Sequence, residues 1–308
     1  MSQRSLLLLY ICVLCCLNTA AQTQRRVLLE IFSTERCNQC PQAHNNIERI
    51  FGNGGDSIVM MGHHAGFYTD ALTIPESLDY EWFYSPNRGL YAPAAMMNRT
   101  YDPDNTSDVF ADGVPIFDGA SAQRLQSAYA SAISVPLSVK VELSTDYDAS
   151  TRQLSITVQS SLLRRLPNAA DLRLNVFLTE DSIFTATQAG KIGSYYHRHT
   201  VRQSLTGTWG ESVNLNQSIE RTYTTAIPEE WNAARMEVIA FVSSYDSQDR
   251  CNCQIYNTAA SHFVEPTTEG ISAPQADLPF VEAPYNLLGQ RLKADARGIR
   301  IQQGRIIM

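Results

Sequence analysis

The stretch Thr34-Glu35-Arg36-Cys37-Asn38-Gln39-Cys40-Pro41 places two cysteines, three positions apart, between two apolar segments. The segment before it, residues 27–32, is a continuous apolar run of the kind that predicts a short buried strand. After it, apolar residues recur at helical spacing as far as Phe51, with Pro41 at the favoured first position of a helix. A C-x-x-C pair between a strand and a helix is typical of a dithiol or disulfide site.

Length and charge set broad limits on the rest of the chain. Its 308 residues are enough for about two domains. A net charge of −7, with a pI near 5.4 and no basic stripe, argues against a nucleic-acid partner, which would need a positive face.

The first 21 residues have the pattern of a signal peptide. Arg4 supplies the positive start, residues 6–17 form the apolar core, and small residues precede a cleavage point after Ala21. The apolar run is shorter than the roughly 20 residues that a membrane-spanning helix needs. An alternative is lipidation at Cys15 or Cys16, which would anchor the chain in a membrane.

Cleavage after residue 21 would remove three cysteines and leave four. These are Cys37, Cys40, Cys251 and Cys253. An even number is what an exported chain in an oxidising compartment permits, and spacing favours the pair within C-x-x-C. Cys251 and Cys253 form a possible second disulfide, a local staple in a loop, although a C-x-C ring is strained and pairing elsewhere stays open.

Residues 22–134 predict an α/β domain. A second buried strand is expected over residues 57–62, Pro93 opens another short apolar run, and residues 121–133 have helical periodicity. Strands that alternate with helices favour a sheet with parallel pairs. Glu30 is the single charged residue inside the first strand.

From residue 135 the pattern changes to apolar residues that alternate with polar ones. This period of two, over residues 137–143 and 154–158 and again in later runs, predicts an antiparallel β-sandwich of immunoglobulin-like type over residues 135–264. Residues 265–284 are rich in Pro, Thr and acidic side chains and predict a linker. Residues 285–308 predict a small C-terminal β tail. The expected fold class is therefore α/β plus all-β.

The first part of the chain resembles thioredoxin-like proteins, in the order of its strand, C-x-x-C, helix, strand and proline-led strand. The resemblance implies that Cys37 is a nucleophile, that Cys40 resolves the mixed disulfide, and that Pro93 is the cis-proline that faces the cysteines. Pro115 is a rival for that position. Glu30 would be either a proton-handling carboxylate beneath Cys40 or a satisfied structural one. No Trp precedes Cys37, and Asn38-Gln39 matches neither the reducing nor the oxidising members.

The whole arrangement resembles a Bacteroidetes outer-membrane (lipo)protein family. The residues that carry this resemblance are the C-x-x-C domain, Tyr195-Tyr196-His197-Arg198-His199 and Trp209-Gly210-Glu211. The tail, with Tyr285-Asn286-Leu287-Leu288-Gly289-Gln290-Arg291 and Gly298-Ile299-Arg300-Ile301, resembles a type IX secretion sorting signal, except that Arg300 replaces the usual aromatic residue. Both resemblances imply an exported protein of the periplasm, outer membrane or cell surface.

Two functional hypotheses follow. In the first, the protein is a thiol–disulfide oxidoreductase-like envelope protein whose partners are protein thiols or disulfides, or extracytoplasmic peptides. In the second, it is a non-enzymatic surface binding or adhesion protein with a structural Cys37–Cys40 disulfide. No cofactor and no metal is expected, because the adjacent His63 and His64 point to opposite faces of a strand and His197 lies in another predicted domain. The oligomeric state stays open.

Overall fold

The structure, a computed structural model, describes residues 25–85, 89–105, 109–166 and 171–264 and the backbone of residues 300–302 and 305–307. The chain divides into two compact units, residues 1–266 and 267–308. In the second unit, β15 (Arg300–Gln302) and β16 (Arg305–Ile307) form an antiparallel pair. The expected signal peptide, the linker and most of the expected tail lie outside the described residues.

The first unit begins with a strand that is buried on both faces. β1 (Val27–Ser33) pairs in parallel with β2 (Ile58–His64), and α2 (Cys40–Phe51) connects them. β3 (Ala94–Met97) pairs antiparallel with β1 on its other side, and β4 (Ile116–Asp118) pairs antiparallel with β3. The mostly apolar composition of β1 and β2 suits this central position, because both of their faces are covered.

Helices cover one face of this part of the sheet. α4 (Ala122–Ser134) begins at Ser121, whose hydroxyl accepts a hydrogen bond from the Arg124 main-chain N–H and so satisfies one of the free donors of the first turn. α2 and α4 pack their apolar faces on alternate residues of β1, among them Leu29 and Ile31. Among the described residues between β2 and β3, the helices are two short turns, α3 (Pro75–Leu78) and η1 (Asp79–Phe83).

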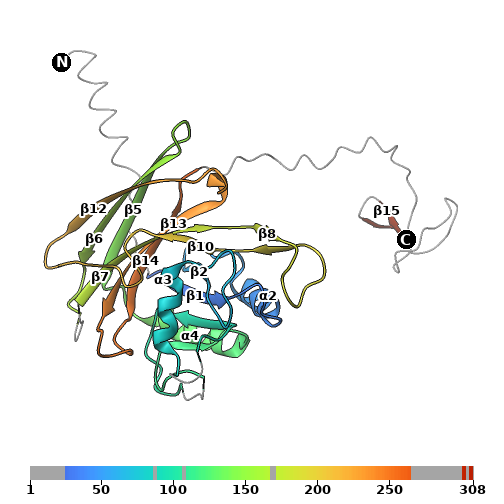
Figure 1. The fold of residues 1–308 in the computed structure, drawn as a ribbon, viewed down its shortest axis with the longest axis horizontal. Coiled ribbons are helices and arrows are strands. Elements are labelled where there is room, and N and C mark those ends of the chain that lie inside the picture. The colour runs from blue at the N-terminus through green and yellow to red at the C-terminus, as the bar shows by residue number, and fades with distance from the viewer. Residues whose placement is uncertain are drawn as a thin grey trace, which may run out of the picture. The chain divides into compact units, whose positions relative to one another are not determined.

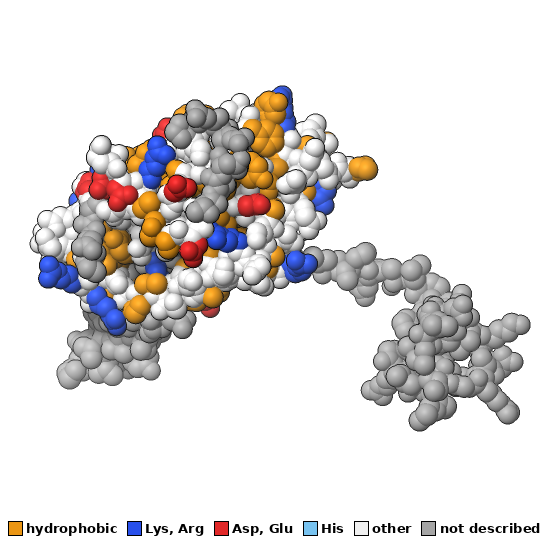
Figure 2. Space-filling model, turned by 90° about the horizontal axis from the view of Figure 1, so that it is seen from below, with side chains coloured by type: hydrophobic (Ala, Val, Ile, Leu, Met, Phe, Trp, Pro, Cys, Tyr) orange, Lys and Arg blue, Asp and Glu red, His pale blue; other side chains and the backbone are white. Residues whose placement is uncertain are grey.

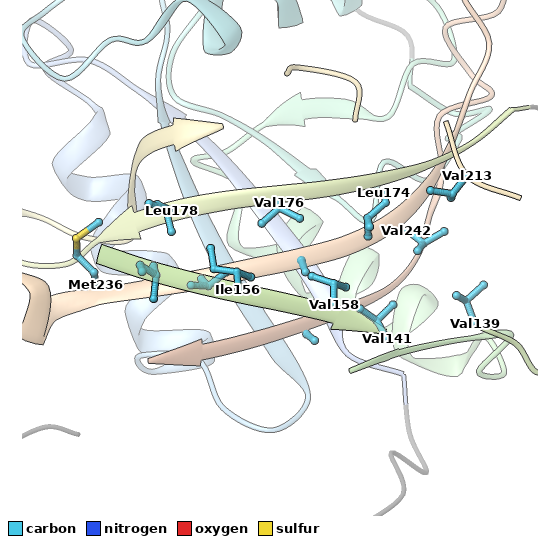
Figure 3. Packing of buried hydrophobic residues seen from close by; sticks show 14 of the residues in the cluster. Val139, Val141, Ile156, Val158, Leu174, Val176, Leu178, Val213, Met236 and Val242 are labelled. Atoms are coloured by element: carbon cyan, nitrogen blue, oxygen red, sulfur yellow. The ribbon is translucent and has the colours of Figure 1, made fainter. Parts of the chain in front are cut away.

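The remaining strands build two antiparallel layers. The smaller sheet has the order β12-β6-β5, with β5 (Val139–Asp148), β6 (Gln153–Leu162) and β12 (Ile219–Ala226). The larger sheet contains β7 (Asp171–Glu180), β10 (Thr200–Ser204), β11 (Glu211–Ser212), β13 (Met236–Tyr245) and β14 (Ile255–His262). Between the layers lies a core of aliphatic side chains such as Val141, Ile156 and Val176 (Figure 3). The described part of the chain is therefore mostly β-sheet with few helices, consistent with a β-sandwich.

One sheet runs through both halves of the first unit, in the order β14-β13-β7-β10-β2-β1-β3-β4 (Figure 1). The junction is the pairing of Thr200 in β10 with Gly62 in β2. A Cβ at Gly62 would lie 3.1 Å from the Arg198 carbonyl oxygen, so a residue without a side chain lets the two strands approach. The predicted boundary at residue 135 falls between α4 and β5, but the parts on either side of it share this sheet.

A small hairpin stands apart from both sheets. β8 (Ile183–Thr185) and β9 (Tyr195–His197) pair only with each other among the strands of the described chain, and residues 186–194 join them. This loop passes beside the start of α2 (Figure 1). On the face in Figure 2, basic and acidic side chains are intermixed with hydrophobic ones. Within the described ranges, no helix is both long and apolar enough to cross a membrane.

Candidate functional site at the Cys37–Cys40 disulfide

Cys37 and Cys40 form a disulfide at the start of α2, and Cys40 is the first residue of that helix. Their Cα atoms are 5.4 Å apart, and the Cys40 main-chain N–H donates to Cys37 Sγ at 3.0 Å. A helix N-terminus with an N–H aimed at sulfur favours the thiolate form once the bond is reduced. Both residues are buried, Cys37 being 2% and Cys40 0% exposed.

The loop before β3 lies against this disulfide. Ala92 packs with both cysteines, and the Ala92–Pro93 peptide is cis. A Cβ at Gly66 would come within 2.9 Å of Ala92 Cβ, which shows how closely the segment after β2 packs on this loop. The structure thus brings Ala92, the residue before Pro93, against the cysteines. Pro115 instead lines a separate hollow with Phe117 and Arg124.

A segment that is distant in sequence lies against the cysteine motif. The Ala189 main-chain N–H donates to the Glu35 carbonyl at 2.7 Å, and Gln188 Nε2 donates to the Cys37 carbonyl at 3.1 Å. Thr185 Oγ1 donates to Glu35 Oε1 at 2.8 Å. We refer to residues 185–191 as the covering loop. No local pattern in the sequence indicates it, because its partners lie about 150 positions away, as the separations of 150 and 151 for two of these bonds show.

A cluster of histidines lies next to the covering loop. The rings of His64 and His197 are 4.5 Å apart, and His64 Nδ1 is 2.9 Å from a carboxylate oxygen of Asp70. Burial, together with the neighbouring histidines, lowers the pKa of His197 to about 3. Burial would raise the pKa of Asp70, but hydrogen bonding to His64 and the charge of that ring hold it well below the usual range. Asp70 in turn accepts from the Glu35 main-chain N–H at 2.9 Å, which ties the cluster to the cysteine motif.

The histidine on α2 reaches the same hairpin. His44 Nδ1 is 2.6 Å from the hydroxyl of Tyr195 in β9, and burial lowers the pKa of His44 to about 4. Beside it, a cavity of about 230 Å³ is lined in part by His44, His64 and Tyr195. No group of three or more His, Cys, Asp or Glu side chains in the described ranges is arranged to hold a metal ion.

Glu30 lies away from the cysteines. Its neighbours Leu29 and Ile31 face α2 and α4, so Glu30 points to the opposite face of β1. There it pairs with Arg99 through bonds of 2.8 Å and 2.7 Å, and His63 Nε2 lies 3.4 Å away. Burial alone would raise the pKa of Glu30, but the charge and hydrogen bonds of Arg99 lower it to about 2. This geometry describes a paired, ionised carboxylate that stabilises the fold.

Cys251 and Cys253 are free thiols in the structure, so the possible second disulfide is not formed. Cys253 is fully buried among the aromatic residues around Tyr80, and burial raises the pKa of its thiol to about 12. Cys251 Sγ is 3.5 Å from the Gly113 carbonyl oxygen. A buried thiol with a raised pKa is a poor nucleophile.

Fold and site together define a mostly-β protein with a helix-borne disulfide beneath a loop of its sandwich. The family model described as outer membrane protein Omp28 matches residues 89–260, more than half of the chain. The chain belongs to the Omp28 outer membrane protein family, and it is an exported protein of the periplasm, outer membrane or cell surface. The match begins after the cysteines, so it carries no information about their chemistry.

The chain is also similar to solved structures. HBP35 of Porphyromonas gingivalis is 18% identical, with a TM-score of 0.60 over 92% of this chain and 96% of that one, which supports the fold alone. A domain of the outer membrane lipoprotein Omp28 from Porphyromonas gingivalis is 24% identical over 41% of this chain and 88% of that one, with a TM-score of 0.28. No curated protein matches the sequence.

Proposed function

We propose that this protein exchanges disulfides with protein thiols or disulfides, or with peptides, outside the cytoplasm, through Cys37 and Cys40. The observation that carries the proposal is the position of the pair, with Cys40 as the first residue of α2 and its N–H aimed at Cys37 Sγ. Cys37 is the nucleophile and Cys40 the resolving thiol. Pro93, in the loop that packs on the pair, presents the partner's peptide.

The proposal includes a thioredoxin-like domain at residues 22–134, followed by a β-sandwich domain at residues 135–264. Its support is the strand order β2-β1-β3-β4 and the placement of α2 and α4 on the same face of those strands. This order puts the start of α2 beside the loop that precedes β3. A partner polypeptide that reaches the disulfide would therefore meet both.

The exchange needs only the two cysteines and a partner. A partner thiolate attacks Cys37 Sγ, the Cys37–Cys40 bond breaks, and Cys40 leaves as a thiolate that takes up a proton. A second partner thiolate then displaces Cys37 from the mixed disulfide, so the partner loses two electrons and the protein gains them. The reverse sequence, with attack by Cys37 and resolution by Cys40, reduces a partner disulfide.

The test is to trap the mixed disulfide. A Cys40→Ser variant lacks the resolving thiol, so it should accumulate Cys37-linked partners when the reduced protein meets oxidised envelope proteins, whereas a Cys37→Ser, Cys40→Ser double variant should not. The reduction potential of the wild-type pair should lie above about −300 mV. A lower potential, together with no trapped partner, would contradict the proposal.

A second function is favoured by the burial of both sulfurs. Cys37 and Cys40 are 2% and 0% exposed, as expected of a structural disulfide in a surface protein that binds without catalysis. That function predicts the low potential and the absence of trapped partners. The same experiment therefore separates the two.

We also propose that residues 285–308 are a type IX sorting signal and that the mature chain starts at Gln22, leaving membrane association to surface attachment. The motifs of the tail and the outer-membrane family support this. Mass spectrometry of the mature termini should find residue 22 first and the tail removed. An acylated Cys16 at the start would instead show lipid anchoring.

A further inference from the structure

The contacts of the covering loop carry one further inference. We propose that residues 185–191 occupy the place of a partner polypeptide on the Cys37–Cys40 motif, so that the disulfide becomes accessible only when this loop is displaced. The occlusion does not depend on the proposed function; the identity of the displacing partner rests on it. The partner chemistry is a peptide turn with glycine where Gly190 now lies.

The loop binds main-chain carbonyls of the motif through one main-chain N–H and the Gln188 side chain, and a 3.2 Å bond from the Lys191 N–H to the Gln188 carbonyl closes the loop into a turn. Ala189 N–H donates to the Glu35 carbonyl, and the Gln188 side-chain amide donates to the carbonyls of Cys37 and Thr34. These acceptors belong to the backbone around the cysteines, so any peptide with the same conformation could use them. The loop thus occupies the hydrogen-bonding positions that a partner would need.

The closest contact is made by a glycine. Gly190 has a φ of +77°, and a Cβ built on it would lie 2.2 Å from the Asn38 carbonyl oxygen, between the two cysteines. No side chain fits there, because Cβ atoms do not approach an oxygen so closely. The loop therefore fits the motif only with glycine at this position.

Among the described strands, no strand pairing joins the hairpin that carries the loop to either sheet. β8 and β9 pair with each other and with no other described strand, and an isolated two-stranded hairpin is marginally stable. Beneath it, Gln188 Oε1 and both ring nitrogens of His197 are buried without a hydrogen-bond partner. Unsatisfied buried polar groups lower the stability of the closed form relative to an open one in which water reaches them.

Aromatic side chains lie exposed beside the covered motif. Tyr68 is 50% and Phe67 47% exposed, and the Arg36 guanidinium lies over the Tyr68 ring at 4.8 Å. Since Arg36 directly precedes Cys37, this pair marks the rim of the motif. Displacement of the loop would free the carbonyl acceptors of the motif. Together with the aromatic rim, these acceptors would form one surface that a peptide could bind.

Two glycine variants test the occlusion. Gly190→Ala adds a Cβ against Asn38, whereas Gly193→Ala, at a similar φ of +86°, adds one in open space. The two variants thus share the backbone penalty but differ in the contact. Dithiothreitol should reduce the Cys37–Cys40 bond of full-length Gly190→Ala about tenfold faster than that of wild type or Gly193→Ala, because the open form is more populated. A tenfold larger open population corresponds to about 1.4 kcal/mol. Alkylation of the thiols that form measures the rate.

A third variant separates opening of the loop from general destabilisation of the fold. Gln188→Ala removes the hydrogen bonds to the motif without adding an atom, and it should also accelerate reduction while thermal unfolding stays close to that of wild type. Equal reduction rates in wild type and all three variants would overturn the occlusion. So would acceleration only in variants that unfold globally at the assay temperature.

A peptide tests the partner chemistry. A synthetic peptide with the sequence of residues 184–191, added to Gly190→Ala, should slow reduction back towards the wild-type rate, and a scrambled peptide should not. If both peptides act equally, or neither acts, the peptide site is refuted. Trapping by Cys40→Ser answers a separate question, so its failure would remove the exchange function and leave the occlusion intact.

Discussion

Replacing Arg99 by Met should destabilise the protein far more than an exposed ion pair would suggest. Arg99 follows β3 and is 1% exposed, with its guanidinium bound to both carboxylate oxygens of Glu30 and to the Tyr80 hydroxyl at 2.7 Å. It also lies over the rings of Trp209 at 5.7 Å and Phe241 at 5.3 Å, which belong to the second half of the chain. Methionine retains much of the apolar volume and removes the charge.

The magnitude follows from the carboxylate left behind. The pKa of Glu30 falls from 4.5 to about 2 in the folded protein. A lowering of this size corresponds to roughly 3 kcal/mol of stability at neutral pH. Breaking a buried ion pair on one side typically costs about 3–5 kcal/mol, because an uncompensated charge stays buried. We therefore expect Arg99→Met to lose about 3–5 kcal/mol at pH 7.

The loss should shrink in acid. Because the folded pKa of Glu30 is lowered, its stabilising effect is present above pH 4.5 and is lost as the pH falls towards 2. In Arg99→Met, burial raises the pKa of the Glu30 carboxyl. At low pH this carboxyl is therefore protonated in the folded variant, and no unpaired charge stays buried. The gap between wild type and variant should be widest at pH 7 and should narrow below pH 4.5.

Urea unfolding followed by tryptophan fluorescence measures this gap. Glu30→Gln and the double variant Glu30→Gln, Arg99→Met complete a double-mutant cycle. The double variant should be more stable than Arg99→Met by about 2 kcal/mol, because no buried charge remains unpaired. If Arg99→Met lies within about 1 kcal/mol of wild type, or the two single losses simply add, the ion pair does not stabilise the fold as argued.

Three further predictions concern the histidines and the strand junctions. The folded pKa values of His44 and His197 lie near 4 and 3, so the free energy of unfolding should fall as the pH drops below about 6.5, by up to about 1.4 kcal/mol per pH unit for each histidine. In His197→Leu, the urea midpoint should therefore change less between pH 6.5 and 5 than it does in wild type. Asn98→Ala should cost about 1–3 kcal/mol in urea unfolding, since the Asn98 side chain accepts from the buried Leu28 N–H at 2.8 Å; a loss below 0.5 kcal/mol would contradict this. Gly62→Ala should lower the thermal midpoint by several degrees, because its Cβ would press on a carbonyl 3.1 Å away before β10; an unchanged midpoint would show that the strands separate freely.

Local patterns predicted the elements whose burial is uniform or strictly alternating. The apolar run over residues 27–32 became β1, and Pro41 marks the start of α2 as expected. The alternating run over residues 154–158 lies inside β6. β12 gave no such signal, because most of its residues, from Ile219 to Ala226, are exposed or half-buried. Hydrophobic periodicity is informative only where one face is buried.

The shared sheet could not be read from the sequence. Its two halves meet through one residue pair, Thr200 and Gly62, and a single bridge imposes no repeating pattern on either segment. The same limit applies to the partner of Glu30. A charged residue inside a buried strand must have a counter-ion, but nothing local indicates that Arg99, 69 positions away, supplies it.

The candidate site divides in the same way. The spacing of Cys37 and Cys40 alone indicated their pairing, and the proline-led run indicated that Pro93 opens a strand. The covering loop depends on long-range contacts of Gln188 and Ala189, whose residue types are unremarkable for a loop. Sequence reasoning therefore located the cysteines and missed the loop that is bound to the backbone around them.

Glu35 contacts both the covering loop and the partner of the histidine cluster. Its main-chain N–H binds Asp70, the partner of His64, while its carbonyl and carboxylate accept from Ala189 and Thr185 of the covering loop. A shift of the loop therefore changes contacts of the residue that starts the turn into the cysteines, and reduction of the cysteines changes the backbone on which the loop rests. Because the two events share these bonds, the oxidised and reduced proteins should differ in how tightly they hold the loop. A looser hold on the loop in one redox state would reconcile the burial of the disulfide with the proposed exchange.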